Sequence, residues 1–182
     1  LAFSGGKDSS YSLYRLRKDY DVSVLAVTFD NGFLTDQCRR NIDTVTAALD
    51  VDSLVVKPSL HKLAKIFRLA ETGDIFPQKA LERASAICTA CIGLVKTVAY
   101  REAILRGVPF VCFGWTPGQA PVKSPVIKLD HRMIAANQKQ LKTPIISGLG
   151  TDYGGYFLEA GWLEEQADGI PSLVYPLVFE TY

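Results

Sequence analysis

Six consecutive residues near the start of the chain have the side chains and the backbone freedom needed to hold a phosphate. They follow three apolar residues, precede a helix-like run, and are Ser4, Gly5, Gly6, Lys7, Asp8 and Ser9. Adjacent glycines can adopt positive φ and let the backbone approach a ligand closely, and the N–H groups at the start of a helix favour an anion. The Lys7 ammonium adds a positive charge beside them. The segment therefore predicts a pyrophosphate-binding loop, with ATP as the expected ligand. Residues 4–9 are named the phosphate loop below.

Two other loops of related composition do not fit this segment. A Walker-type P-loop requires glycine where this chain has Leu1, and Ser or Thr where it has Asp8. A serine nucleophile in a Ser-x-x-Lys motif is accompanied by Ser-Asp-Asn and Lys-Thr-Gly, and the sequence contains neither. An ordinary Gly-Gly turn would explain the glycines but not the serines, lysine and aspartate around them.

A pair of cysteines, Cys88 and Cys91, forms the second candidate group. Two thiolates at this spacing can bind one soft metal ion or support persulfide chemistry, and a helix N-terminus lowers a thiol pKa. The alternative is two small core residues at the start of an amphipathic helix. Complete zinc or iron–sulfur ligation needs further ligands. Cys112 is a better third-ligand candidate than Cys38, because it lies just before Gly114 at the expected active edge.

The ends of two predicted strands supply further candidates. Thr28, Phe29 and Asp30 close an apolar, β-branched run, and Asp30 either contacts a ribose or belongs to an Asp-Asn-Gly turn into the next helix. After the other strand, the segment 114–119 contains Trp and Gln beside two glycines, which is typical of a binding loop. The alternative there is a tight turn around a packed Trp.

Strand-like and helix-like runs alternate along the chain, which predicts right-handed βαβ units. The expected strands are 22–29, 53–57, 110–113 and 173–178. The first expected helix follows the loop and ends near residue 19. The other expected helices span 34–49, 60–70, 79–87, 92–106 and 130–141. The fold class expected is α/β, with a doubly wound, mostly parallel sheet and helices on both faces. A 3-2-1-4 strand order would place the phosphate loop at the switch point where such sheets bind ligands.

Composition indicates one globular domain over residues 1–182, because 48% of the residues are hydrophobic and 21% are charged. The chain begins within the first strand, so an excerpt of a longer protein is expected. A formal net charge of +1 is not that of a dedicated nucleic-acid binder. No run is long and apolar enough to cross a bilayer, and the cysteine usage favours a reducing compartment, so a cytoplasmic protein with no membrane partner is expected. A diffuse basic region that could meet an anionic substrate consists of Lys123, Lys128, Arg132, Lys139 and Lys142.

The phosphate loop contains the complete Ser-Gly-Gly-x-Asp-Ser signature and resembles that of the PP-loop ATP pyrophosphatases. This resemblance implies an adenine nucleotide α-hydrolase-like fold. It also implies an enzyme that uses ATP and Mg²⁺, releases pyrophosphate, and transfers AMP to a carbonyl-type oxygen from which a nucleophile displaces it. Lys7 and Asp8 would be catalytic, together with Cys88 and Cys91. The ATP site would comprise Ser4, Gly5, Gly6, Lys7, Asp8, Ser9, Thr28, Phe29, Asp30 and Gly114.

Two branches of these enzymes are similar to the sequence. The N-acetyl sugar amidotransferases, which take ammonia from a glutaminase partner, resemble it over residues 27–33 and also contain a Cys-x-x-Cys motif. The tRNA 2-thiolation enzymes share that motif followed by Gly and a basic residue, and their cysteines carry sulfur or an iron–sulfur cluster. The Gly-His and Gly-Glu pairs typical of these branches are replaced here by Gly114-Trp115.

The longer similarity at the second strand favours nitrogen transfer as the expected reaction. The alternatives are sulfur transfer to tRNA, which would involve a sulfur-carrier partner, and a non-catalytic adenine-nucleotide-binding module. The intact sequence Lys7-Asp8-Ser9 argues against the last of these. The expectations also include a second substrate, which is a small molecule or RNA. They include zinc or an iron–sulfur cluster at Cys88 and Cys91, and a homodimer.

Overall fold

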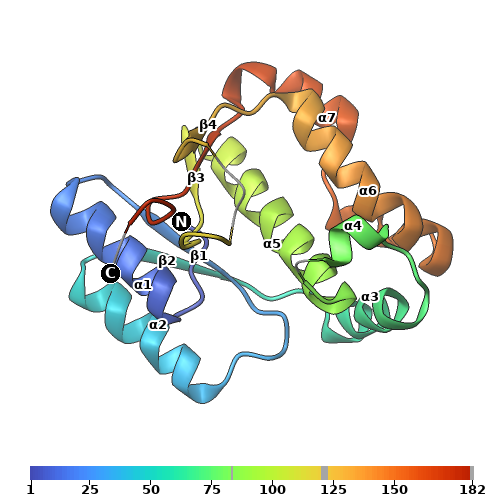
Figure 1. Ribbon diagram of the computed structural model, residues 1–182, viewed down its shortest axis with the longest axis horizontal. Helices are drawn as coiled ribbons and strands as arrows, with labels where there is room; N and C mark the ends of the chain where they lie inside the picture. The colour runs from blue at the N-terminus through green and yellow to red at the C-terminus, as the bar shows by residue number, and fades with distance from the viewer. Residues whose placement is uncertain (83, 120–122, 181–182) are drawn as a thin grey trace.

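The computed structural model describes residues 1–82, 84–119 and 123–180 (Figure 1). Its helices are α1 (Lys7–Tyr14), α2 (Asp36–Ala48), α3 (Leu60–Thr72), α4 (Gln78–Leu81), α5 (Ala86–Leu105), α6 (His131–Leu149) and α7 (Ala160–Glu165). The π-helical turn η1 (Arg15–Asp19) extends α1, and the 3-10 turns η2 (Thr151–Tyr156) and η3 (Ala167–Gly169) flank α7. The strands are β1 (Leu25–Phe29), β2 (Asp52–Val56), β3 (Phe110–Cys112), β4 (Val126–Ile127) and β5 (Ser172–Val174).

The strands form two small sheets that the first residues of the chain connect. In one sheet β1 pairs in parallel with β2, and in the other β5 pairs in parallel with β3 and antiparallel with β4. Ala2 makes parallel bridges to both Val27 and Phe113. Its N–H donates to the carbonyl oxygen of Cys112 at 2.9 Å, and the Phe3 N–H donates to that of Val27 at 2.9 Å. Residues 1–3 therefore lie between β1 and β3 and deliver the phosphate loop to that position.

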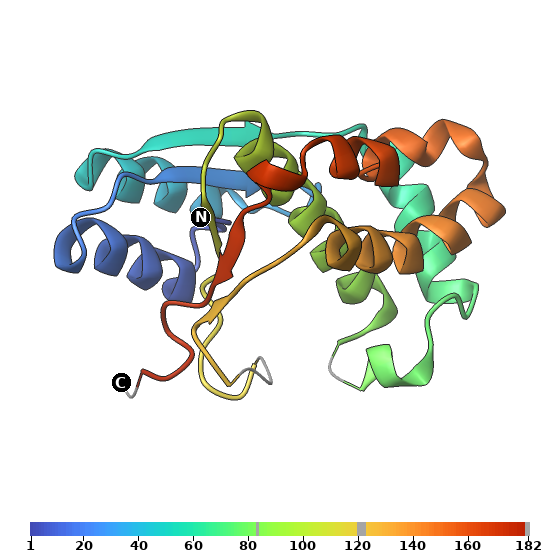
Figure 2. The ribbon, with the colours of Figure 1, turned by 90° about the horizontal axis from the view of Figure 1, so that it is seen from above.

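Helices cover both faces of β1, whose alternate side chains point to opposite sides. Ala26 packs with Leu13 of α1 and Ile42 of α2. Val27 and Phe29 pack on the other side in a core built by α3, α5 and α6. In both views α3 and α6 lie together at the end of the molecule away from α1 (Figures 1 and 2). The mixed α/β class expected from the sequence is confirmed.

Several predicted boundaries are wrong, and local capping or packing explains the two largest errors. The predicted helix 79–87, whose residue 83 lies outside the described residues, stops at Leu81, and α5 begins at Ala86 rather than near residue 92. Ser85 caps α5 by accepting a hydrogen bond from the Cys88 N–H at 3.2 Å. The helix α6 continues to Leu149 instead of ending near 141, because burial of Ile145 favours the next turn despite an internal proline.

The strand predictions also differ from the structure in extent. β1 begins at Leu25 instead of 22, and the last strand ends at Val174 instead of 178. The short strand β4 (Val126–Ile127) was not predicted, because two residues carry no periodicity and the strand forms only by pairing with β5.

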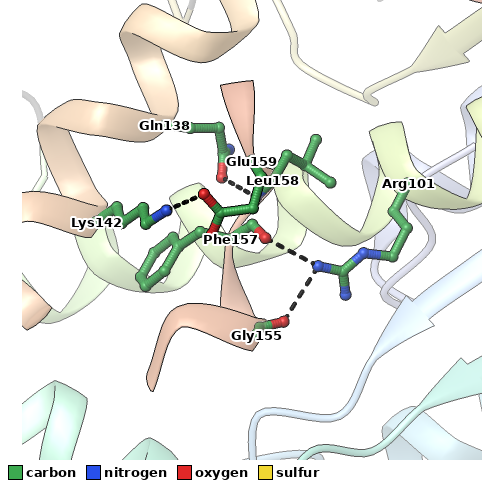
Figure 3. A network of polar contacts seen from close by, with 7 residues as sticks. All are labelled: Arg101, Gln138, Lys142, Gly155, Phe157, Leu158 and Glu159. Carbon is green, nitrogen blue, oxygen red and sulfur yellow. Dashed lines mark hydrogen bonds and ion pairs between the residues drawn. The ribbon is translucent and has the colours of Figure 1, made fainter. Parts of the chain in front are cut away.

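Side chains from α5 and α6 hold the end of η2 and the residues that follow it (Figure 3). Arg101 donates to the carbonyl oxygens of Gly155 at 3.1 Å and Phe157 at 3.2 Å. The buried Gln138 carboxamide oxygen accepts from the Leu158 N–H at 3.2 Å. These bonds satisfy backbone groups of an irregular segment that packs against the core.

One member of the predicted basic region takes part in this network. Lys142 forms an ion pair with Glu159 (Figure 3), so its charge is already matched within the chain. The other four are exposed and consist of Lys123, Lys128, Arg132 and Lys139. Within the described ranges, no helix has the length and apolar character required to pass through a membrane.

Candidate functional site

The phosphate loop is held in a conformation that requires glycine at one position. Gly5 has a φ of 71°, in the left-handed region. A Cβ atom at Gly5 would lie 2.8 Å from the carbonyl oxygen of Cys38 in α2. Asn41 of the same helix donates from Nδ2 to the Gly5 carbonyl oxygen at 3.1 Å. Helix α2 thus fixes the loop from outside, and only glycine fits between them.

Both serines of the loop bond within it and shape its inner surface. The Ser4 and Ser9 hydroxyl oxygens lie 3.2 Å apart, and Ser9 also donates to the Gly6 carbonyl oxygen at 3.0 Å. Gly6 is the N-cap of α1 and has no side-chain cap hydrogen bond. The N-terminus of α1 therefore opens directly behind the loop, where its dipole favours an anion.

The charged residues of the loop lie at its exposed rim. The Lys7 ammonium nitrogen is 3.4 Å from Oδ1 of Asp8, and the side chains are 79% and 30% exposed, respectively. An ammonium and a carboxylate this close and this accessible can each contact a different part of a ligand, the ammonium a phosphate oxygen and the carboxylate a cation.

A pocket of about 390 Å³ opens in front of the loop, at the carboxyl ends of β1 and β3. It is large enough for a small-molecule ligand. Of the residues predicted to bind ATP, the structure brings together at this pocket Ser4, Gly6, Lys7, Asp8, Ser9, Thr28, Phe29 and Gly114. The predicted binding loop contributes Trp115 and Gln119 to the same wall. Gly5 supports the loop from behind, and Asp30 lies outside the pocket lining.

Thr28 and Gly114 have structural contacts that explain their positions. The Thr28 hydroxyl donates to the Phe3 carbonyl oxygen at 2.7 Å and is buried, so it joins β1 to residues 1–3, which precede the loop. A Cβ at Gly114 would lie 3.0 Å from atoms of Asp8, Ser9 and Ser12, so this glycine lets β3 approach the first turn of α1 closely.

Asp30 acts within the turn that follows β1. One carboxylate oxygen accepts from the Gly32 N–H at 3.0 Å, and the other accepts from Arg39 at 3.1 Å. The side chain is fully buried. The turn interpretation accounts for these contacts, and contact with a ribose stays a prediction.

The buried Asp30 carboxylate predicts a pH-dependent contribution to stability. Burial opposes ionisation, but the Gly32 N–H and the Arg39 guanidinium outweigh it and hold the pKa of Asp30 below its ordinary value of 3.8. A depressed folded-state pKa gives stability that is present above the unfolded-state pKa and is lost as pH falls through the folded-state pKa.

We therefore expect Asp30→Asn to lower the free energy of unfolding at pH 7 by about 2 kcal/mol, the scale of hydrogen bonds to a charged group. The difference from the unsubstituted protein should narrow as pH falls below 3.8. Urea unfolding between pH 7 and pH 3 measures both quantities. Asp43→Asn, on the exposed side of α2, is the matched control and should show neither effect. An equal loss at pH 7 in both variants would contradict the assignment.

The two cysteines of the pair lie in the first turns of α5 and differ in their surroundings. Cys88 is exposed, whereas Cys91 is half-buried. Asn31 donates from Nδ2 to the Cys91 sulfur at 3.3 Å, and Asn31 also lines the pocket. Burial raises the pKa of the Cys91 thiol, and the Asn31 hydrogen bond acts in the opposite direction. The cysteine pair therefore adjoins the pocket through one side chain.

The structure does not bring Cys112, the candidate for a third ligand, into one metal-binding group with the cysteine pair. Cys112 is buried, and its surroundings are a separate, almost wholly apolar pocket of about 490 Å³ at the amino ends of β1 and β3. In the described part of the chain, no group of three or more His, Cys, Asp or Glu side chains could hold a metal ion. Cys88 and Cys91 by themselves do not fit a complete zinc or iron–sulfur site.

Several residues at the pocket were missed from the sequence. Ile92 and Val95 of α5 line it, at the one-turn spacing that follows Cys88 and Cys91 on the same side of a helix. This helical spacing could have identified Ile92 and Val95 from the sequence. Lys96 lies beside them, with its ammonium 5.1 Å from the centre of the Trp115 ring. Partial burial lowers the pKa of Lys96, and no pattern in the sequence indicated that this lysine is half-buried.

Comparison with protein-family models gives no match for this chain. Among curated proteins, the chain is similar to the uncharacterized protein MJ1599 of Methanocaldococcus jannaschii, with 27% identity over 114 residues. The match covers 63% of this chain and 36% of the archaeal protein, so the chain matches about a third of that protein's length.

Proposed function

We propose that the chain is an ATP-dependent adenylating enzyme of the PP-loop type, which cleaves ATP to AMP and pyrophosphate. The observation that carries the proposal is the pocket itself. A glycine-containing loop at a helix N-terminus, with Lys7 and Asp8 at its rim, faces the carboxyl ends of two parallel strands. Such edges of parallel sheets are where nucleotides bind in α/β proteins.

The strand arrangement supports a doubly wound sheet as part of this proposal. The bridges of Ala2 join the two sheets, and the order of the segments across them is β2, β1, residues 1–3, β3 and β5. Every neighbouring pair in this order is parallel. The phosphate loop then leaves the central strand between helices of the two faces. This order supports the proposal of a 3-2-1-4 arrangement.

The residues of the loop have distinct roles in the proposed reaction. The Lys7 ammonium and the helix dipole would stabilise the pyrophosphate as the bond between its oxygen and the α-phosphorus breaks. The Asp8 carboxylate fits Mg²⁺, which prefers oxygen ligands and is commonly shared with substrate phosphates. A carbonyl-type oxygen of the second substrate attacks the α-phosphorus, and pyrophosphate leaves with the bonding electrons.

Displacement of AMP completes the reaction. In the nitrogen-transfer form, ammonia adds to the activated carbon, loses a proton, and AMP leaves as the anion. That form requires an ammonia source such as a glutaminase partner. An anionic second substrate, such as a nucleotide sugar, could also use the Lys96 ammonium near Trp115.

A second candidate function, sulfur transfer, is favoured by one contact. Asn31 places the Cys91 sulfur directly behind the pocket wall, with Cys88 exposed nearby. A thiol in this position could carry a sulfane sulfur to the activated carbon, and the other thiol would then form a disulfide that an external thiol reduces.

The labelled products of ATP test the main proposal. The chain is incubated with Mg²⁺ and ATP labelled at the α-phosphate, with and without ammonium or nucleotide-sugar acceptors, and the products are separated. Labelled AMP with pyrophosphate supports the proposal. Labelled ADP, or ATP bound without any turnover across the acceptors, contradicts it, and the second result favours a nucleotide-binding module.

For the sulfur-transfer candidate, we expect the chain to acquire one sulfur atom at a cysteine when it is incubated with a persulfide donor. Intact-mass measurement detects the addition, and peptide mapping locates it. Cys91→Ser should abolish a subsequent transfer to an acceptor, while Cys112→Ser, in the separate pocket, should not. Transfer that survives in both Cys88→Ser and Cys91→Ser would assign the pair to packing.

A further inference from the structure

The Asn31 side chain is fixed by the turn that carries it. Its Oδ1 atom accepts a hydrogen bond from the Phe33 N–H at 3.0 Å, which leaves the amide nitrogen as the only group that can face Cys91. Gly32, with a φ of 88°, allows the chain to reverse, and the Asp30 carboxylate accepts from the Gly32 N–H at 3.0 Å. The orientation of the amide is therefore set before any ligand binds.

Asn31 connects the pocket with one cysteine and not with the other. It forms part of the pocket wall, and its Nδ2 atom lies 3.3 Å from the Cys91 sulfur. Cys88 is exposed, and its backbone N–H is engaged by Ser85. Ile92, the residue after Cys91, also lines the pocket. The two thiols of the pair are thus unequal: one lies against the pocket wall and the other faces solvent.

We propose that Asn31 is a positioning residue that makes Cys91 the pocket-side thiol and leaves Cys88 as the solvent-side thiol. Asn31 acts through the Cys91 sulfur, to which it donates a hydrogen bond, and it couples the occupancy of the pocket to the accessibility of Cys91. Cys88 is then the thiol that an external donor reaches first. This inference rests on the proposed function, because it takes ATP to be the ligand of the pocket.

Selective protection of the thiols tests the inference. The chain is treated with iodoacetamide in the presence and absence of ATP and Mg²⁺, and the modification rates of Cys88 and Cys91 are measured separately by peptide mass spectrometry. ATP should slow the modification of Cys91 by about 5-fold, the scale of one hydrogen bond, and that of Cys88 by less than about 2-fold. ATP binding is measured on the same samples by equilibrium dialysis.

The variant Asn31→Asp isolates the donor. An aspartate carboxylate can still accept from the Phe33 N–H and keep the turn, but it offers no N–H to the sulfur. We expect the protection of Cys91 to fall below about 2-fold when ATP saturates the variant, and equilibrium dialysis sets the ATP concentration that this requires. Asn137→Asp, the same substitution on the exposed side of α6, should leave the protection unchanged.

Three results would overturn the inference. They are equal protection of the two thiols, full protection retained in Asn31→Asp, and a Cys91 that does not react even without nucleotide. If dialysis shows that ATP does not bind, the proposed function fails together with the inference. If ATP binds and Cys91 is not selectively protected, only the role of Asn31 is rejected.

Discussion

Replacing Lys7 by alanine is expected to lower the rate of AMP formation from ATP by about 100-fold, the usual cost of removing one group that stabilises transition-state charge. The Lys7 side chain is 79% exposed at the pocket rim, so its truncation removes no core packing. The effect should appear mainly in kcat, because negative charge on the leaving pyrophosphate grows as the reaction proceeds. Rates with ATP labelled at the α-phosphate, together with the melting temperature, measure it.

Two further variants separate a local role of Lys7 from a general loss of positive charge. Lys65→Ala removes an exposed lysine from α3, outside the basic region, and should leave the rate unchanged. Lys7→Arg keeps the charge but replaces a compact ammonium by a planar fork, so it should recover only part of the activity. A Lys7→Ala enzyme with nearly normal turnover and an unchanged melting temperature would remove the phosphate loop from the proposed reaction.

The clustering of residues 4–9 in one loop could be predicted from the sequence because these residues are contiguous. Ser4 and Ser9 are five positions apart, and their hydroxyls meet at 3.2 Å because one tight loop joins them. The strands β1 and β2 and the helices that follow them were also predicted, since their apolar patterns are regular. Local spacing and periodicity were sufficient for these features.

The other side of the pocket could not be predicted in the same way. Asn31 and Cys91 are 60 residues apart in the sequence, and only the packing of α5 against β1 brings them to 3.3 Å. The contact between Lys96 and Trp115 depends on the same packing. Sequence spacing carries no information on such pairs unless the fold is already known.

Cys112 shows how position along a strand can mislead. It precedes Gly114 near the carboxyl edge, which suggested that it could join the cysteine pair. Cys112 is the last residue of β3 and contributes instead to the apolar pocket at the other end of the strands. Gly114, two residues later, contributes to the candidate site.

The substitution Gly5→Ala is expected to lower the free energy of unfolding by about 3 kcal/mol and the melting temperature by roughly 6–12 °C. Two costs combine at this position. Gly5 has a φ of 71°, which disfavours any residue with a Cβ, and the added Cβ would lie 2.8 Å from the backbone carbonyl oxygen of Cys38. A backbone atom in the first turn of α2 cannot move aside as a flexible side chain can, so the loop itself must shift.

That shift should also remove ATP binding, because the Gly5 carbonyl oxygen is bonded to Asn41 and the loop between them shapes the pocket. Urea unfolding and equilibrium dialysis with ATP measure the two effects. Gly161→Ala is the matched control: a Cβ there meets no atom within 4 Å, and the residue lies inside α7, so alanine should stabilise the protein by about 0.5–1 kcal/mol. Opposite effects of the two glycine-to-alanine changes on the free energy of unfolding would show that the destabilisation comes from the geometry of the phosphate loop. A Gly5→Ala protein of normal stability that still binds ATP would mean that the left-handed backbone is not required for the site.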